Sequence, residues 1–303
     1  MLIVRIFACL YVGLLSFAEI AGNEGNIYLA RANLSTTQGK GIGYKKGYST
    51  LEGFLMTSRF KCDSFYPFFD LRLHGMDNLK LAMNAGAGTR YLTKSMWIFG
   101  INTYYDTRQG SHRGFNRVGN PFQQVGVGLE ALSPYVDFRL NFYIPVGRKL
   151  WKFEQITYND NAGVIPIYHK KWQSTMQGFN AEVGGSLGRW NLCECFDFSS
   201  YLAAGPYYFD QHKGSGRLGG QVRLTSVFAR YFLFELKGSY DHISNGTFQI
   251  KGGIEFPIYP TSSKRGKKSC PEPCYADGFW PSLIEMIAQP IMRMEIMPFN
   301  PAS

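Results

Sequence analysis

Apolar and polar residues alternate along most of the chain with a period of two, and this pattern predicts β-strands. Between 134 and 145, the apolar positions from Val136 to Ile144 alternate with Asp137, Arg139 and Asn141. A strand places two such sets on opposite faces. About eleven segments of this kind lie near 48–58, 66–74, 79–91, 95–106, 122–132, 134–145, 176–188, 197–209, 217–228, 230–241 and 246–256.

Three features favour a transmembrane barrel over a soluble sandwich. The segments approach the roughly 9–11 residues that a tilted strand needs to cross a bilayer, whereas ordinary strands have about five or six. Their polar faces carry charges and glycine, which suit a polar lumen. Aromatic residues gather at the segment ends, where we expect an interface girdle of Tyr91, Tyr104, Tyr105, Tyr135, Tyr143, Tyr207 and Tyr208. The predicted fold class is all-β, an antiparallel transmembrane barrel.

The lengths of the connections predict the direction of each strand. The connections 107–121, 146–175 and 210–216 are long, and those between them are tight. Outer-membrane barrels have short periplasmic turns and long external loops, so the first counted segment must run inward. A chain that starts in the periplasm then needs one earlier, outward strand. Ile27 to Leu34 is the candidate, and it raises the expected number of strands to twelve.

The first residues have the form of a secretory signal. Arg5 is followed by an apolar run from Ile6 to Phe17 and by small residues around Ala18. We therefore expect a signal peptide over 1–18, with a cut as late as 22, a barrel over 27–257 and a tail over 258–303. The expected location is the outer membrane of a Gram-negative bacterium.

The polar faces of the predicted strands supply both signs of charge to the lumen. Besides Asp70 and Arg72, the residues expected to face it are Lys80, Arg90, Glu130, Asp137, Arg139, Glu182, Arg223, Glu235, Lys237, Lys251 and Glu255. Interleaved opposite charges can cross-link the wall of a narrow barrel. A selective pore more often has one dominant sign at its constriction. Both a closed barrel and a pore remain open at this point.

Five cysteines remain after removal of the signal, and they are candidates for disulfides in an oxidising periplasm. They are Cys62, Cys193, Cys195, Cys270 and Cys274. An odd number leaves one thiol unpaired or bonded to another envelope protein. Zinc is the rival interpretation, but no histidine lies near and the spacings are not the common two-residue gap. We expect no metal, no cofactor and no catalytic residues, since no nucleophile or metalloprotease motif occurs and the histidines are scattered.

Four segments in order resemble the β-domain of inverse autotransporters, the intimin and invasin type. They are 79–91 (LKLAMNAGAGTRY), 99–106 (FGINTYYD), 124–130 (QVGVGLE) and 138–145 (FRLNFYIP). The resemblance covers roughly 45–257. It implies a twelve-stranded barrel whose C-terminal linker threads the lumen and displays a passenger outside. Only 47 residues follow Phe256 in this sequence, too few for immunoglobulin-like passengers.

The tail permits two interpretations. It is basic near Lys264 and apolar from Trp280 to Met294, with a short helix expected before Pro290. It could thread the lumen, as a plug or an emerging linker, or remain a periplasmic segment. The predicted function is a surface anchor, adhesin-like or structural, with a transport pore as the alternative. Expected partners are outer-membrane lipid, the barrel-assembly machinery and, through disulfides, other envelope proteins; an exported chain meets no nucleic acid.

Overall fold

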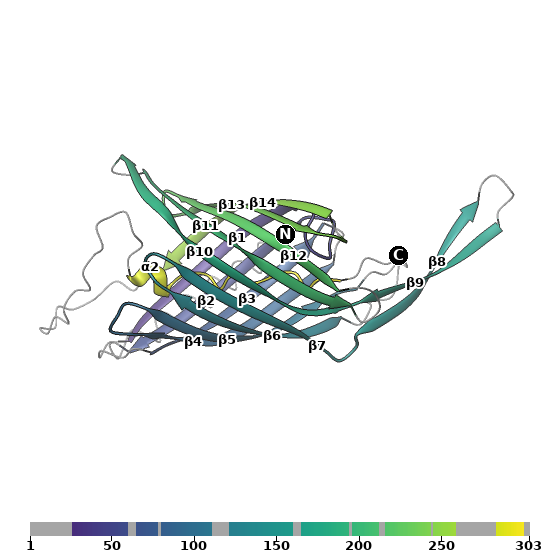
Figure 1. Cartoon of the computed structure of the whole chain (residues 1–303), viewed down its shortest axis with the longest axis horizontal. Coiled ribbons are helices and arrows are strands. Elements are labelled where there is room, and N and C mark those ends of the chain that lie inside the picture. The colour runs from purple at the N-terminus through teal and green to yellow at the C-terminus, as the bar shows by residue number, and fades with distance from the viewer. Residues whose placement is uncertain are drawn as a thin grey trace, which may run out of the picture.

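The computed structural model describes residues 26–59, 65–77, 80–110, 121–159, 165–193, 196–211, 216–243, 245–258 and 283–299. Within these ranges, twelve strands form one closed antiparallel barrel (Figure 1). They are β1 (Asn26–Gly39), β2 (Tyr48–Arg59), β3 (Phe65–Met76), β4 (Leu81–Leu92), β5 (Ile98–Arg108), β6 (Phe122–Leu132), β7 (Asp137–Val146), β10 (Met176–Cys193), β11 (Phe196–Gln211), β12 (Arg217–Phe228), β13 (Phe232–Asp241) and β14 (Asn245–Ile258). The predicted fold class and strand number are confirmed.

The first and last strands close the barrel. On one side β1 pairs with β2 from Asn26↔Arg59 to Thr37↔Tyr48. On its other side β1 pairs with β14 from Ala30↔Ile258 to Gly39↔Gln249. The strand that parity required at the N-terminus is therefore present, and it is the one that completes the ring. Closure matters because an unpaired strand edge inside a bilayer would leave backbone groups without partners.

The alternation along each strand separates a lumen face from an outer face. In β5, buried and exposed residues alternate from Ile98 to Asp106. On β7, Phe138, Phe142 and Ile144 are exposed, while Asp137, Arg139 and Asn141 at the alternate positions are buried. The outer face is thus covered with large apolar side chains and the inner face with polar ones. This arrangement is the reverse of a soluble protein and matches a wall between lipid and a polar lumen.

The expected tyrosine girdle is only partly correct. Tyr91, Tyr105, Tyr135 and Tyr208 are exposed on the outside. The prediction is wrong for three others, which are buried on the lumen side: Tyr104, Tyr143 and Tyr207. The physical reason is the pleat, because two consecutive residues of a strand point to opposite faces. Tyr104, Tyr143 and Tyr207 face the lumen because the adjacent Tyr105, Phe142 and Tyr208 are exposed on the outside.

Two parts of the chain extend beyond the barrel wall, at opposite ends (Figure 1). The long connection after β7 contains a separate two-stranded hairpin of β8 (Leu150–Asn159) and β9 (Ile165–Ser174). We call this the hairpin end of the barrel, and the end with connections 93–97, 133–136 and 229–231 the turn end. At the turn end, β10 continues past its last pair with β7 at Gly184 and pairs only with β11.

The described part of the tail, residues 283–299, passes through the barrel. The helix α2 (Leu283–Ile287) lies at the turn end, and the following residues run inside the lumen towards the hairpin end (Figure 1). Phe299 there forms an isolated bridge with Thr175, just before β10. No helix in the described ranges has the length and apolarity needed to cross a membrane. Of the two interpretations of the tail, the structure has the threaded one.

The outward position of Leu71 gives a test of the lipid-facing surface. Leu71 is 39 % exposed near the middle of β3, whereas Tyr240 is 67 % exposed near the hairpin end of β13. We expect Leu71→Arg to lower the free energy of unfolding by about 2–4 kcal/mol and Tyr240→Arg by about 0–1 kcal/mol, because the cost of a charge falls from midplane to interface. Urea titration of protein refolded in lipid vesicles measures both. Equal costs for the two variants would contradict the assignment of this face to lipid.

Candidate functional site: the lumen and its threaded tail

An apolar cluster closes the lumen at the turn end. Met286 and Ile287 of α2, followed by Ile291, are almost completely buried. They pack against wall residues from five strands, namely Leu29, Phe54, Met56, Phe68, Ile98 and Leu132. Glu285 ties the same helix to the overhanging part of β10 through an ion pair of 2.9 Å with Arg189. The short helix therefore closes this end of the lumen: its buried face packs through apolar side chains, and its exposed face forms an ion pair with β10.

Beyond the helix, wall side chains donate hydrogen bonds to main-chain carbonyls of the tail. Arg90 donates Nη1–H to the carbonyls of Ile287 and Gln289, the second at 2.9 Å. Arg31 reaches the carbonyl of Ala288 at 2.9 Å. Further along, the pairs are Arg72 with Ile291 at 2.8 Å, Asn141 with Met292 at 3.0 Å, and Arg108 with Met297. The main chain of the tail is thus held along its course through the lumen.

Arg293 forms the central ion pair between tail and wall. Its Nη2 lies 2.5 Å from Oδ2 of Asp106 on β5, and both side chains are only 2 % exposed. The guanidinium also lies over two lumen tyrosines, 4.1 Å from the ring centre of Tyr104 and 5.6 Å from that of Tyr143. Tyr143 in turn accepts a 2.8 Å hydrogen bond from the Met294 N–H. The inward tyrosines therefore have a role in binding the tail.

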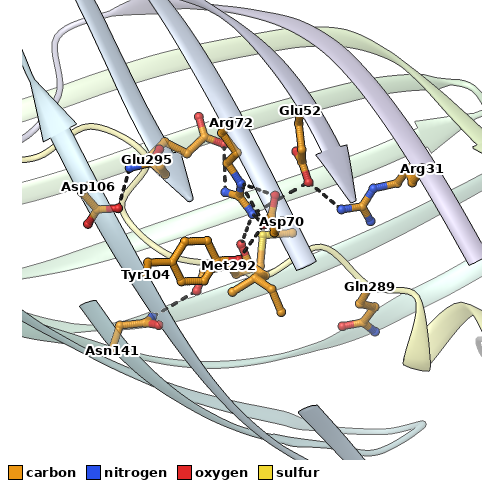
Figure 2. Close-up of polar contacts among 12 residues, drawn as sticks. Arg31, Glu52, Asp70, Arg72, Tyr104, Asp106, Asn141, Gln289, Met292 and Glu295 are labelled. Atoms are coloured by element: carbon orange, nitrogen blue, oxygen red, sulfur yellow. Dashed lines mark hydrogen bonds and ion pairs between the residues drawn. The ribbon is translucent and has the colours of Figure 1, made fainter. Parts of the chain in front are cut away.

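Glu295 makes the second charged contact, two residues further on. Its Oε1 accepts a hydrogen bond of 2.6 Å from Lys251 Nζ of β14. Its Oε2 accepts one of 2.9 Å from the Tyr48 hydroxyl of β2. Arg72 of β3 approaches the same carboxylate at 3.9 Å (Figure 2). One carboxylate thereby joins three strands that lie around the β1–β14 closure.

Many of the other lumen charges form ion pairs along the wall, and Figure 2 shows those among Arg31, Glu52, Asp70 and Arg72. Some pairs lie two residues apart on one strand, as Asp70 and Arg72 do at 2.7 Å. Others cross between strands: Arg31–Glu52 at 2.6 Å, Arg90–Glu130 at 3.0 Å and Arg223–Glu182 at 2.8 Å. In all of these, both side chains are at most 6 % exposed. Opposite charges therefore cross-link the wall.

The structure brings most of the residues expected in the lumen together there. Those buried in the wall are Arg90, Glu130, Asp137, Arg139, Glu182, Arg223 and Lys251. Glu235, Lys237 and Glu255 lie on the same inward positions of β13 and β14 and are half-buried. Lys80 lies just before β4 rather than on it, where burial and the nearby Arg108 lower its pKa to about 8.

Several charged residues of the lumen wall and of the tail were not predicted from the sequence. They are Arg31, Glu52, Asp106, Arg108, Arg293 and Glu295. The first four occupy inward positions on strands that the alternation had located, so extending the same parity to every strand would have found them. The two tail residues carry no such signal, because the tail has no period of two.

The candidate disulfides remain predictions. Cys193 is the last residue of β10, whereas Cys62, Cys195, Cys270 and Cys274 lie outside the described residues. Among the described residues, no group of three or more histidine, cysteine, aspartate or glutamate side chains is placed to hold a metal ion.

A comparison with known protein families finds one family that matches part of the barrel. The sequence profile of the inverse autotransporter β-domain matches residues 45–190. Residues 45–190 belong to the inverse autotransporter β-domain family. The match runs from just before β2 to near the end of β10, so the family resemblance seen in four segments of the sequence is confirmed over this part. A search of curated protein sequences gives no match.

Several solved structures resemble this barrel at low sequence identity. A membrane protein from a study of in-meso crystallization has a TM-score of 0.48 at 15 % identity, over 75 % of this chain and 84 % of that one. An outer-membrane channel of Pseudomonas putida F1 has a TM-score of 0.40 at 12 % identity, over 78 % and 98 %. The β-domain of the Bordetella autotransporter BrkA has a TM-score of 0.36 at 12 % identity, over 77 % and 100 %.

Removing one partner of a buried pair tests the energetics of the lumen. Arg90→Met leaves Glu130 buried without its arginine and removes two bonds to the tail, so we expect the free energy of unfolding to fall by about 3–5 kcal/mol. The double variant Arg90→Met/Glu130→Leu is expected to lose less, because no unpaired charge remains. Urea titration in lipid vesicles measures both changes.

The matched control is Arg230→Met. Arg230 forms a 3.0 Å ion pair with Asp197, but its side chain is 72 % exposed. An exposed pair contributes only about 0–1 kcal/mol. If the Arg90 and Arg230 variants lose the same stability, the lumen is more hydrated than these contacts imply.

Proposed function

We propose that the protein is a surface anchor in the outer membrane of a Gram-negative bacterium. In this proposal the barrel is embedded in lipid, its own tail closes the lumen, and the hairpin end faces outside. The proposal includes the expected partners, outer-membrane lipid and the barrel-assembly machinery. The secretory signal that would direct the chain to this membrane lies outside the described residues and remains a prediction.

The outer surface and the connections support the membrane location and the orientation. Large apolar residues are exposed on neighbouring strands, such as Leu71, Ile101, Leu129 and Phe142. A soluble protein rarely exposes so broad an apolar surface. The turn end has connections as short as 229–231, and the hairpin end carries the β8–β9 extension. In outer-membrane barrels, the longer connections lie outside the cell.

The ion pair between Arg293 and Asp106 is the observation that carries the anchor proposal. It joins the tail to the barrel wall at 2.5 Å, away from both apolar ends of the lumen. A tail held at this point, with apolar contacts at the turn end and at Phe299, occupies the path that a solute would take. A barrel that uses its lumen to hold its own chain serves for attachment rather than passage.

The transport pore is the alternative, and the lumen charges weigh against it. A selective pore needs charges that remain available to a passing ion. Here Arg31, Arg72, Arg139 and Arg223 are each within 3.0 Å of a carboxylate oxygen. Lumen charges that are already neutralised by neighbours offer little attraction to a solute.

The β8–β9 hairpin is the element that suits an adhesin-like role. It forms a sheet of its own, outside the barrel, at the hairpin end (Figure 1). Both of its strands are therefore placed to meet a partner beyond the membrane.

No catalytic step is part of the proposal. His74, the lumen histidine of the described strands, bonds to Thr50 at 2.8 Å and to Asn84 at 2.5 Å, and these contacts fit a structural role.

Conductance of the full chain tests the anchor proposal. We expect refolded wild-type protein in a planar lipid bilayer to give no stepwise current, because the tail blocks the lumen. The double variant Arg293→Ala/Glu295→Ala loses both charged contacts of the tail and is expected to give frequent opening steps. Glu182→Gln serves as the matched control because it weakens a wall pair, with Arg223, rather than a tail contact. It is expected to give no stepwise current. Regular stepwise current from the wild-type protein would favour the pore.

A further inference from the structure

The main-chain contacts of the tail do not depend on its sequence. Five wall side chains donate to the carbonyls of six tail residues, at positions 287, 288, 289, 291, 292 and 297. Every residue of a polypeptide carries a carbonyl, so an extended chain can offer acceptors to these donors in many positions. Such contacts hold a chain in the lumen but leave its register unspecified.

The charges of the tail behave differently, because each one has a defined partner on the wall. From Trp280 to Ser303 the chain has three charged residues, Glu285, Arg293 and Glu295. Glu285 meets Arg189 at 2.9 Å at the turn end. Arg293 meets Asp106 at 2.5 Å, and Glu295 meets Lys251 at 2.6 Å. All three charges are paired, along a path that runs from one end of the lumen towards the other.

A shift of the tail along the lumen would break these ion pairs first. A slip of two residues moves an extended chain by about 7 Å and returns its carbonyls to a similar orientation. The same slip would put either Ile291 or Glu295 at the place of Arg293, because these are its neighbours at that spacing. Asp106 would then be buried without a cation. An uncompensated buried charge is among the most costly defects in a protein interior.

We propose that the wall partners of Glu285, Arg293 and Glu295 fix the register at which the threaded tail comes to rest, while the wall donors hold its main chain regardless of sequence. The ligand in the structure is the chain's own tail, and its recognition signal is an arginine followed two residues later by a glutamate. This inference rests on the proposed closure of the lumen, and it adds what sets the position of the closing segment.

A photo-reactive residue in the full chain can measure the register. Phe299 lies at the hairpin end, with its ring centre 4.8 Å from that of Phe122. Benzoylphenylalanine in place of Phe299 should therefore crosslink, on irradiation, to the proteolytic peptide that contains Phe122, as identified by mass spectrometry. Only barrels that migrate as folded on an unheated gel are analysed, so that a variant that fails to fold is not mistaken for a slipped tail.

Charge reversal then separates register from simple binding. Asp106→Arg or Arg293→Asp alone should lower the yield of the Phe122 crosslink about tenfold or more, with new crosslinks at other wall positions, because the register that buries two like charges is disfavoured. The combination Asp106→Arg/Arg293→Asp should restore the original crosslink. Lys251→Glu and Glu295→Lys provide a second, independent pair with the same expected pattern.

Glu182→Arg is the matched control, because it places a like charge beside Arg223 in a wall pair of 2.8 Å. It should leave the crosslink at Phe122 unchanged. If the single reversals in both tail pairs also leave it unchanged, apolar packing at the two ends sets the register and the inference is overturned, while the closure of the lumen stands. If the wild-type chain itself gives no crosslink to Phe122, the threaded tail and the proposed function fail together.

Discussion

Buried guanidinium groups in the lumen need hydrogen-bond acceptors, and both the barrel wall and the tail provide them. An arginine carries five N–H donors, and a single carboxylate accepts only some of them. Arg90 illustrates the result: its Nε and Nη2 bond to Glu130 at 3.1 and 3.0 Å, and its Nη1 bonds to two carbonyls of the tail. Arg72 divides its donors in the same way, between Asp70 and the carbonyl of Ile291. The wall carboxylates leave some arginine donors without an acceptor, and main-chain carbonyls of the tail accept from several of these donors.

This division makes the tail a part of the core rather than an attachment to it. The lumen has apolar contacts at both ends, around Ile287 at the turn end and Phe299 at the hairpin end, and a polar middle around Arg293. A soluble domain buries apolar residues in its centre, but here the apolar surface faces outward and the interior must be polar. Hydrogen bonds and ion pairs therefore provide the specificity inside that apolar packing provides in other folds.

The barrel itself could be predicted from the sequence because a strand pleat is a strict rule. Period-two alternation located eleven strands, and the parity of loops required the twelfth, which is β1. The same rule, applied to Tyr104 and Tyr105, would have corrected the tyrosine girdle.

The β8–β9 hairpin was not predicted, although two runs rich in aromatic and β-branched residues flank the Asn-Asp-Asn-Ala-Gly sequence at 159–163. A hairpin that is not part of the barrel wall has no division into a lipid face and a lumen face, so the alternation that marks the barrel strands does not extend to it.

The sequence left open whether the tail closes the lumen, because closure depends on contacts between residues far apart in the chain and on neutral groups. Asp106 and Arg293 are 187 positions apart, and the sequence around each residue does not predict that the other is its partner. Counting opposite charges on the strands indicated that the wall could be cross-linked, but such a count treats each arginine as satisfied by one carboxylate. The carbonyls that accept from Arg31, Arg72, Arg90 and Arg108 have no charge and occur at every residue. An excess of arginine donors over carboxylates in a barrel is therefore compatible with an open, anion-attracting lumen and with one filled by polypeptide. Here the backbone of the threaded tail accepts these donors, so the lumen is of the second kind, filled by polypeptide.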